Sequence, residues 1–250
     1  MDSVNRFSNR VADYVKYRPD YPCEIVSILA DECGLKKDSV IADVGCGPGI
    51  SSKMFLDNGN RVIGVEPNAA MREAAKEYLA DYDNFSVVDG RSDATTLANA
   101  SIDLVTAAQA FHWFEPEGTR AEFKRILKPG GRIVLMWNER QLDSNDFHRE
   151  YEAFLVRWSE DYNTVRHENI ATEQLTNFFK GEYGARTFAN NKLYDLDMLT
   201  GRMSSSSYVP SKDDPVYPQM VQELEQIFAK HVVADRIEVR YDTSVYYSLT

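Results

Sequence analysis

The chain has 250 residues, a formal net charge of −11, and 43% hydrophobic and 12% aromatic residues. This apolar content can fill a large core, which excludes a mainly disordered chain. The acidic balance argues against a nucleic acid or an anionic membrane as the main partner, because both are bound through surplus Lys and Arg. Cys23, Cys33 and Cys46 form neither a disulfide framework nor a zinc-binding spacing. With no signal peptide and no membrane span expected, we predict a cytoplasmic protein without a metal site.

Short apolar runs alternate with helical patterns in the first half of the chain. The runs are near-continuous, as expected for strands buried on both faces, and cover residues 39–44, 61–65, 85–88, 102–107 and 132–137. Helices are expected between them at residues 50–57, 69–79 and 116–127, the last stopped by Pro129 and Gly130. This alternation predicts right-handed βαβ units and a parallel sheet, so residues 38–138 form a doubly wound α/β core.

The remaining segments are predicted to belong to the same single domain, residues 1–250. Residues 1–37 form an N-terminal arm, 139–235 an elaboration beside the core that would form most of the substrate side, and 236–250 the terminal strands. Helical patterns cover residues 146–158 and 216–231, and strand patterns cover 184–193 and 237–249. The four serines at 204–207 are typical of a flexible loop.

The sharpest motif is the stretch VIADVGCGPG at residues 40–49. Its strand ends in Asp43, and Gly45, Gly47 and Gly49 follow before a helix. Glycine permits a tight turn and a close backbone approach to a ligand, and this position is the ligand crevice of a parallel sheet. Glu66 closes the next strand, 21 positions after Gly45, where a carboxylate can accept both ribose hydroxyls of an adenosyl group.

Two cofactors compete for this loop. A dinucleotide fingerprint needs its third glycine at the position of Ile50, whereas the last glycine comes one residue early. The carboxylate of Asp43 is also unfavourable beside a pyrophosphate and suits a ligand with a cationic amino-acid end. S-adenosylmethionine carries an ammonium and a sulfonium and no phosphate, so these charges favour it over NAD.

Three motifs together resemble the class I S-adenosylmethionine-dependent methyltransferases: DVGCGPG at 43–49, GVEPN at 64–68 and ILKPGG at 126–131. The resemblance implies a Rossmann-like α/β fold, with a doubly wound, mostly parallel seven-stranded sheet, an N-terminal helical lid and a helical insertion before the last strands. It also implies S-adenosyl-L-methionine as cofactor and S-adenosyl-L-homocysteine as product. The aromatic pattern from Phe7 to Pro22, AQAFHWF at 108–114 and the stretch 204–208 are similar to a small-molecule subgroup, the trans-aconitate methyltransferase-like proteins.

The resemblance also implies roles for single residues. The implied cofactor-binding residues are Asp43, Gly45, Cys46, Gly47, Gly49, Glu66, Pro67, Met71, Ser92, Asp93 and Gln109. Asp43 and the loop would surround the methionyl end, Glu66 would hold the ribose, and Ser92 and Asp93 would lie near the adenine. Family members often carry Ala-Glu where this chain has Ser92-Asp93, which shortens the reach of the carboxylate. Cys46 is expected to be a small packing residue rather than a nucleophile.

Three residues are predicted on the acceptor side: His112, Arg18 and Tyr17. His112 follows the fourth strand and is a candidate general base, with a wall of the cofactor pocket as the alternative. Arg18 lies among tyrosines in the arm, where it would offer a guanidinium to an anionic acceptor, or else belong to a surface helix packed on the core. Asn138, at the end of the fifth strand, is a weaker candidate for an acceptor contact.

We therefore expect an enzyme that methylates a small soluble metabolite, with carboxylic acids among the expected acceptors. An NAD-dependent oxidoreductase is disfavoured by Ile50 and Asp43. Two further alternatives stay open, a non-catalytic S-adenosylmethionine-binding module and a methyltransferase acting on a protein or nucleic acid. The sequence predicts neither the oligomeric state nor the atom that is methylated.

Overall fold

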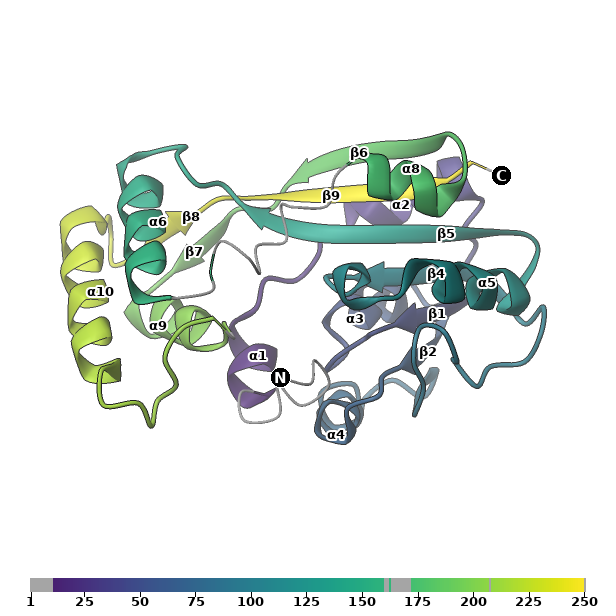
Figure 1. Ribbon diagram of the computed structural model, residues 1–250, viewed down its shortest axis with the longest axis horizontal. Coiled ribbons are helices and arrows are strands. Elements are labelled where there is room, and N and C mark those ends of the chain that lie inside the picture. The colour runs from purple at the N-terminus through teal and green to yellow at the C-terminus, as the bar shows by residue number, and fades with distance from the viewer. Residues whose placement is uncertain (1–10, 160–161, 163–171, 207, 250) are drawn as a thin grey trace.

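The computed structural model describes residues 11–159, 162, 172–206 and 208–249, so Phe7, the arm before residue 11 and Ser207 lie outside the described residues. Its centre is a seven-stranded sheet in the order β3-β2-β1-β4-β5-β9-β6 (Figure 1). The strands are β1 (Val40–Val44), β2 (Arg61–Val65), β3 (Phe85–Val88), β4 (Ile102–Ala108), β5 (Leu127–Arg140), β6 (Tyr183–Ala189) and β9 (Tyr241–Ser248). The first five strands pair in parallel, and β9 is antiparallel to both β5 and β6. The predicted fold class, with its seven-stranded, mostly parallel sheet, is confirmed.

Helices cover both faces of this sheet. The helices of the core are α2 (Glu24–Cys33), α3 (Ile50–Asp57), α4 (Ala69–Tyr78), α5 (Pro116–Ile126), α8 (Thr172–Phe179) and the short 3₁₀ helix η1 (Phe111–Trp113). Apolar residues of α2 and α3 pack in one buried cluster with the sheet, and those of α5 and α8 pack in another. Burial on both faces explains why the strands are apolar along their whole length.

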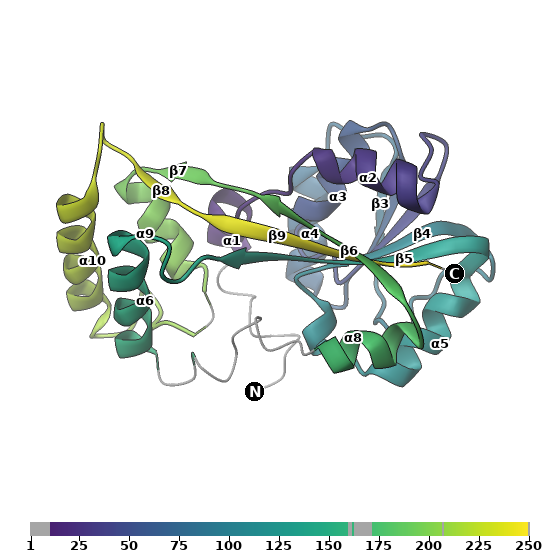
Figure 2. The same cartoon turned by 90° about the horizontal axis from the view of Figure 1, so that it is seen from above.

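A helical lobe lies beside the sheet (Figures 1 and 2). It consists of α6 (Asp146–Trp158), α9 (Leu196–Ser204), α10 (Tyr217–His231) and the two-stranded pair β7 (Lys192–Tyr194) and β8 (Ile237–Val239). These elements enclose a third cluster of buried residues. Helix α1 (Val11–Tyr17) contacts both α9 and α4, so the arm joins the lobe to the sheet domain. Within the described ranges, no helix has the length and apolar character needed to cross a membrane; the cytoplasmic location stays a prediction.

Strand β5 is longer than the predicted 132–137. Helix α5 ends at Ile126, and the chain is extended from Leu127 onward. The pairing with β4 jumps from Leu127 to Arg132, so residues 128–131 form an irregularity in the ladder. Pro129 has no N–H to donate and Gly130 has a φ of 80°, which makes such a bulge a suitable place for both. The two residues expected to separate the helix from the strand therefore lie inside the strand.

The segment 184–193, predicted as one strand, is divided in the structure, and the terminal strands predicted within 236–250 are two strands that belong to different sheets. The strand pattern at 184–193 contains β6 and β7, and the pattern at 237–249 contains β8 and β9. The first segment passes from the main sheet to the lobe pair and the second returns from the lobe pair to the main sheet, side by side at Asn190, whose backbone N–H donates to Tyr241 O at 2.8 Å. An alternating apolar pattern shows which face of a strand is buried, but it does not show which strand it pairs with. The change from one sheet to the other was therefore not predicted.

The serines at 204–206 do not form a flexible loop. Their exposed fractions are 5%, 0% and 1%, and Ser204 is the last residue of α9. Ser205 N donates to Gly201 O at 2.9 Å, and Ser205 Oγ donates to Arg202 O at 2.7 Å. These bonds satisfy carbonyls at the helix C-terminus, which is why small hydroxyl side chains suit a buried position there.

Candidate active site

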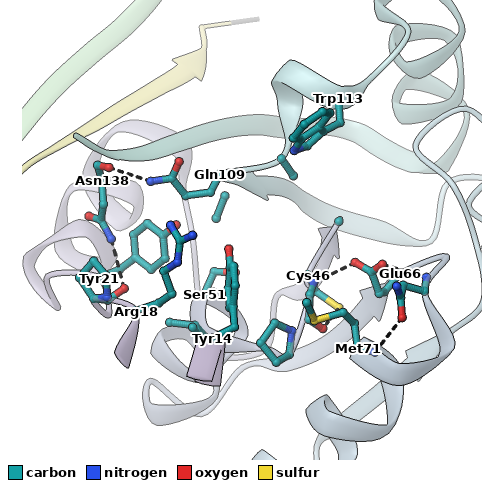
Figure 3. A pocket seen from close by; sticks show the side chains of 18 of the residues that line it. Tyr14, Arg18, Tyr21, Cys46, Ser51, Glu66, Met71, Gln109, Trp113 and Asn138 are labelled. Carbon is teal, nitrogen blue, oxygen red and sulfur yellow. Dashed lines mark hydrogen bonds between the residues drawn. The ribbon is translucent and has the colours of Figure 1, made fainter. Parts of the chain in front are cut away.

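One pocket lies at the carboxyl ends of β1, β2 and β4 (Figure 3). It contains about 1060 Å³ of space, counting the part open to solvent. Its walls come from the glycine loop, the ends of β2 and β4, the arm and α9. Figure 3 shows Glu66 and Met71 toward one end, and Arg18 and Tyr14 toward the other.

The glycine loop approaches the pocket through its backbone. Gly45 and Gly47 have φ angles of 69° and 53°, in the left-handed region that favours glycine. A Cβ on Gly45 would lie 2.7 Å from Ala110 Cβ, whereas one on Gly47 would meet no atom within 4 Å. Gly49 has a different place: it does not line the pocket, and its Cβ would lie 2.6 Å from Leu79 Cδ1. Gly49 therefore allows α3 to pack closely against the end of α4.

Asp43 lies just behind the pocket wall and is completely buried. Its Oδ2 accepts hydrogen bonds from Ser51 Oγ at 2.7 Å and Ser52 Oγ at 2.6 Å, and Ser51 itself lines the pocket. Oδ1 is buried without a partner among the described residues. Burial raises the pKa of Asp43 from 3.8 to about 6, although the two serines act against this rise. A buried carboxylate with an unused oxygen fits a ligand that brings a cationic donor.

Glu66 lies in the wall at the end of β2, with 8% of its surface exposed. Its carboxylate accepts hydrogen bonds from Gly47 N at 3.0 Å and Asn68 N at 2.9 Å. Burial raises its pKa, and these two N–H groups limit the rise. Pro67 and Met71 lie beside it in the same wall. The carboxylate is therefore fixed in orientation and still faces the pocket.

Cys46 is a packing residue in this arrangement as well as part of the lining. Its side chain fills the space that a Cβ on Gly64 would occupy, with Sγ 2.7 Å from that position. Burial raises the pKa of its thiol well above the ordinary value. The thiol therefore stays protonated at neutral pH, which agrees with a packing role and not with a nucleophile.

Gln109 follows β4 and has a φ of 53°, unusual for a residue other than glycine. Its Nε2 donates to Asn138 O at 2.8 Å. Because a carbonyl oxygen only accepts, this bond fixes which end of the amide is Nε2. Oε1 is then buried without a partner among the described residues. Gln109 lines the pocket, so Oε1 is available to a hydrogen-bond donor on a ligand.

Asn138 connects the arm to the sheet. Its Nδ2 donates to Pro19 O at 3.3 Å and Asp20 O at 3.1 Å. Its Oδ1 accepts from Asn190 Nδ2 at 3.1 Å and Thr243 Oγ1 at 2.5 Å. With both ends of the amide in use, Asn138 holds the arm in place rather than offering a free group to an acceptor.

The arm supplies Arg18 to the pocket. Its Nη2 donates to Ser205 O at 3.1 Å, and its guanidinium carbon lies 4.7 Å from the centre of the Tyr14 ring. Burial lowers the pKa of Arg18, and the charge of Arg202 lowers it further. Arg202, on α9, lines the same pocket. The sequence carried no signal for Arg202, because it belongs to no motif and enters the site only through the packing of α9.

Tyr17 and His112 lie outside the pocket lining. The Tyr17 hydroxyl donates to Asp197 Oδ2 at 3.0 Å, and its ring covers Gly201, where a Cβ would lie 2.2 Å from the ring. Tyr17 thus attaches α1 to α9. His112 is part of η1, with its ring centre 4.8 Å from that of Trp113, which does line the pocket. Burial lowers the pKa of His112 to about 4.

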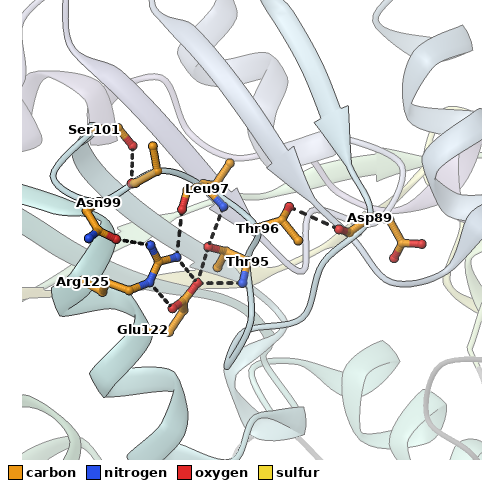
Figure 4. A network of polar contacts seen from close by, with 9 residues as sticks. Asp89, Thr95, Thr96, Leu97, Asn99, Ser101, Glu122 and Arg125 are labelled. Atoms are coloured by element: carbon orange, nitrogen blue, oxygen red, sulfur yellow. Dashed lines mark hydrogen bonds and ion pairs between the residues drawn. The ribbon is translucent and has the colours of Figure 1, made fainter.

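Ser92 and Asp93, predicted near the adenine, are also outside the lining. Ser92 Oγ accepts from Thr119 Oγ1 at 2.8 Å, and Asp93 pairs with Arg91 at 3.1 Å. Both lie on the loop between β3 and β4, next to a polar network shown in Figure 4.

Glu122 is the centre of that network (Figure 4). It accepts from Thr95 N at 2.8 Å and pairs with Arg125 at 2.7 Å, and Arg125 lowers its pKa to about 2. Arg125 in turn donates to Leu97 O at 2.8 Å. The network fixes the loop against α5, which sets the position of the residues that follow β3.

Comparisons with known proteins agree with this site. Residues 42–135 match the family model described as a methyltransferase domain. An uncharacterized methyltransferase of Mycobacterium bovis is 31% identical over 226 residues, which cover 90% of this chain and 86% of that protein. The chain belongs to the methyltransferase family.

Other relatives extend the match to the whole chain. An uncharacterized methyltransferase-like protein of Schizosaccharomyces pombe is 27% identical over 98% of this chain and 95% of its own length. A second methyltransferase of the same organism is 34% identical over 54% of this chain, and that match spans 53% of its length. The structure of a candidate type II methyltransferase from Anaeromyxobacter dehalogenans has the same fold, with a TM-score of 0.72 at 18% identity over 93% of this chain and 97% of that one.

This methyltransferase is of class I and depends on S-adenosylmethionine. The cofactor supplies an electrophilic methyl group on a sulfonium. The residues present fit it: the unused oxygen of Asp43 suits its ammonium, and the fixed carboxylate of Glu66 suits its ribose hydroxyls. The NAD alternative is not favoured.

Proposed function

We propose that this methyltransferase methylates a small anionic molecule, a carboxylic acid, bound beneath the arm. The observation that carries the proposal is Arg18, whose guanidinium shares one pocket with the glycine loop and Glu66. Within the described ranges, the only hydrogen bond of its side chain goes to a neutral carbonyl, Ser205 O. A guanidinium in this place is suited to an anionic group on the acceptor. A carboxylic acid as acceptor also agrees with the resemblance of this chain to the trans-aconitate methyltransferase-like proteins.

On this proposal, the cofactor occupies the side of the pocket formed by the glycine loop and β2. Asp43 accepts from the ammonium, Glu66 holds the ribose, and the glycine loop at Gly45 and Gly47 lets the methionyl end approach the backbone closely. Pro67, Cys46, Met71 and Gln109 complete this wall, because they line the same pocket. The adenine contacts of Ser92 and Asp93 remain a prediction.

The chemistry then needs little beyond positioning. A carboxylate is already a nucleophile, so the protein must hold it in line with the methyl group and exclude water. No general base is required. With its pKa lowered to about 4, His112 is neutral at physiological pH and acts in this proposal as a support for Trp113 in the pocket wall.

The division of the chain follows from the same proposal. Residues 38–138 hold the cofactor, and the arm and the segment 139–235 form the acceptor side. Arg18 and Arg202 come from these two parts and line the pocket together. A non-catalytic binding module would not need such groups, and a nucleic-acid substrate is opposed by the net charge of −11.

The test measures transfer of a labelled methyl group from S-adenosylmethionine to a panel of carboxylic acids, phenols and amines. We expect product with an acid. In Arg18→Gln the KM for that acid should rise about tenfold to a hundredfold, while the Kd for S-adenosylmethionine stays unchanged. Lys16→Gln is the matched control, because Lys16 is an exposed cation of the same arm paired with Asp197. A large loss of cofactor affinity in Arg18→Gln would move Arg18 to the cofactor, and methylation of amines alone would contradict the proposal.

A further inference from the structure

Arg202, from α9, and Arg18, from the arm, line the same pocket. Arg202 donates through Nη1 to Ser206 Oγ at 2.9 Å, and its Nε is buried without a partner in the described part of the chain. Arg18 has the same pattern, with one hydrogen bond to a neutral acceptor and a buried Nε without a partner. The charge of Arg202 is second only to burial in lowering the pKa of Arg18. The two guanidiniums are therefore near enough to repel each other.

Neither guanidinium is paired with a carboxylate among the residues that the structure describes. Arg140, at the end of β5 and beside the same small cavity as Arg202, shows the usual arrangement, because it pairs with Glu152 at 2.5 Å. Besides burial, the largest electrostatic effects on Arg202 come from tyrosines, foremost Tyr241 and Tyr208, which raise its pKa but carry no negative charge at neutral pH. Arginine keeps its proton in proteins, so both residues remain cationic. Two partly buried like charges without a counter-charge destabilise the closed arrangement of arm and lobe.

We infer that Arg18 and Arg202 together bind the anionic group of the methyl acceptor. This inference rests on the proposed function and adds Arg202 as a specificity-determining residue. An anion between the guanidiniums replaces their repulsion by two attractive contacts, and each guanidinium can present parallel N–H groups to a carboxylate. One residue comes from the arm and the other from α9, so the acceptor also strengthens the contact between them. A phosphate group shares this chemistry with a carboxylate.

The cofactor has a carboxylate of its own, which is the competing anion. The test therefore uses protein saturated with S-adenosylhomocysteine, in which the methionyl carboxylate is already bound. Acetate, succinate and inorganic phosphate are titrated separately, and the melting temperature is followed. We expect the carboxylates to raise the melting temperature of the wild type. In Arg202→Met their apparent affinity should fall about tenfold to a hundredfold, as expected for loss of a charged hydrogen bond.

Three further readouts separate this role from a structural one. Without added anion, Arg202→Met should melt no lower than the wild type, because it removes a repulsion and keeps the apolar stem. Its Kd for S-adenosylhomocysteine should stay within about twofold of the wild type. Arg236→Gln is the matched control, since Arg236 is an exposed arginine near α9 that pairs with Asp195, and it should keep the full response to carboxylates.

Several results would overturn the inference. An equal response of the wild type and Arg202→Met would remove Arg202 from the anion site. A loss of S-adenosylhomocysteine affinity would assign Arg202 to the cofactor. Stabilisation by phosphate without any effect of the carboxylates would refute the carboxylate class. All of these are binding measurements. A failure to detect methyl transfer to any acid would therefore contradict the proposed function, but it would not change the measured binding of anions by Arg18 and Arg202.

Discussion

Replacing Asp43 by Asn should stabilise the protein without cofactor and weaken cofactor binding. Asp43 is completely buried, and its pKa is raised from 3.8 to about 6 because burial disfavours its charge. Each pKa unit corresponds to about 1.36 kcal/mol, so the ionised carboxylate costs the folded state about 3 kcal/mol at neutral pH. Asn has nearly the same shape and no charge. We therefore expect Asp43→Asn to unfold at higher urea concentration than the wild type, with a gain of up to about 3 kcal/mol.

The pH dependence of this gain is part of the prediction. The folded pKa lies above the unfolded one, so the destabilisation is present above pH 6. As the pH falls through 6 toward 3.8, the folded protein takes up the proton first and the cost disappears. The free energy of unfolding of Asp43→Asn should therefore exceed that of the wild type by the full amount at about pH 8, and the difference should have largely disappeared at about pH 4.

Urea unfolding followed by circular dichroism at several pH values measures this difference. The control is Asp57→Asn, because Asp57 is an exposed carboxylate paired with Lys53 at 2.8 Å, and we expect it to change stability little or unfavourably. Calorimetry should show that Asp43→Asn binds S-adenosylmethionine about tenfold to a hundredfold more weakly. A variant less stable than the wild type near pH 8, or one with unchanged cofactor affinity, would refute the reasoning.

Three further substitutions test other parts of the site. Glu66→Gln should raise the Kd for S-adenosylmethionine about tenfold or more, because a neutral amide accepts ribose hydroxyls less strongly and its single oxygen can accept from only one of Gly47 N and Asn68 N; an unchanged Kd would exclude the ribose role. Gly201→Ala should detach α1 and reduce stability by about 1–3 kcal/mol, because its Cβ would lie 2.2 Å from the Tyr17 ring; Gly181→Ala, where a Cβ meets nothing within 4 Å, is the neutral control. His112→Gln should leave the shape of the pH–rate profile between about pH 6 and 8 unchanged, because His112 is neutral throughout that range with a pKa of about 4; a titration near neutral pH that disappears in the variant would restore His112 as general base.

The parts of the fold that the sequence predicted correctly depend on local signals. Strands β2 and β3 have the predicted boundaries, because an apolar run between turn residues determines a buried strand by itself. The glycine loop was also predicted from a local signal, because glycines directly after a strand permit the left-handed backbone that Gly45 and Gly47 adopt. Helix α4 begins at Ala69, as predicted, because the side chain of the preceding residue, Asn68, caps it by accepting from Met71 N at 3.1 Å.

The acceptor side depended on contacts between residues distant in sequence, which no local pattern contains. Arg18 reaches Ser205, 187 positions later, and Asn138 reaches Pro19, 119 positions earlier. Helices α2, α8 and α9 were not predicted, and the burial of Ser205 follows from the packing of α9. Arg202 could not be identified as a site residue until this packing brought it into the pocket. The pocket wall formed by the glycine loop and the end of β2 was therefore predictable from local motifs, and the wall formed by the arm and α9 was predicted only at Arg18.

The most direct test of the central claim is a calorimetric titration of the purified wild-type protein with S-adenosylmethionine, S-adenosylhomocysteine and NADH. We expect saturable binding of both adenosyl ligands and none of NADH, because the buried carboxylate of Asp43 suits a cationic amino acid and is unfavourable beside a pyrophosphate. Binding of NADH without either adenosyl ligand would contradict the assignment of S-adenosylmethionine as the cofactor.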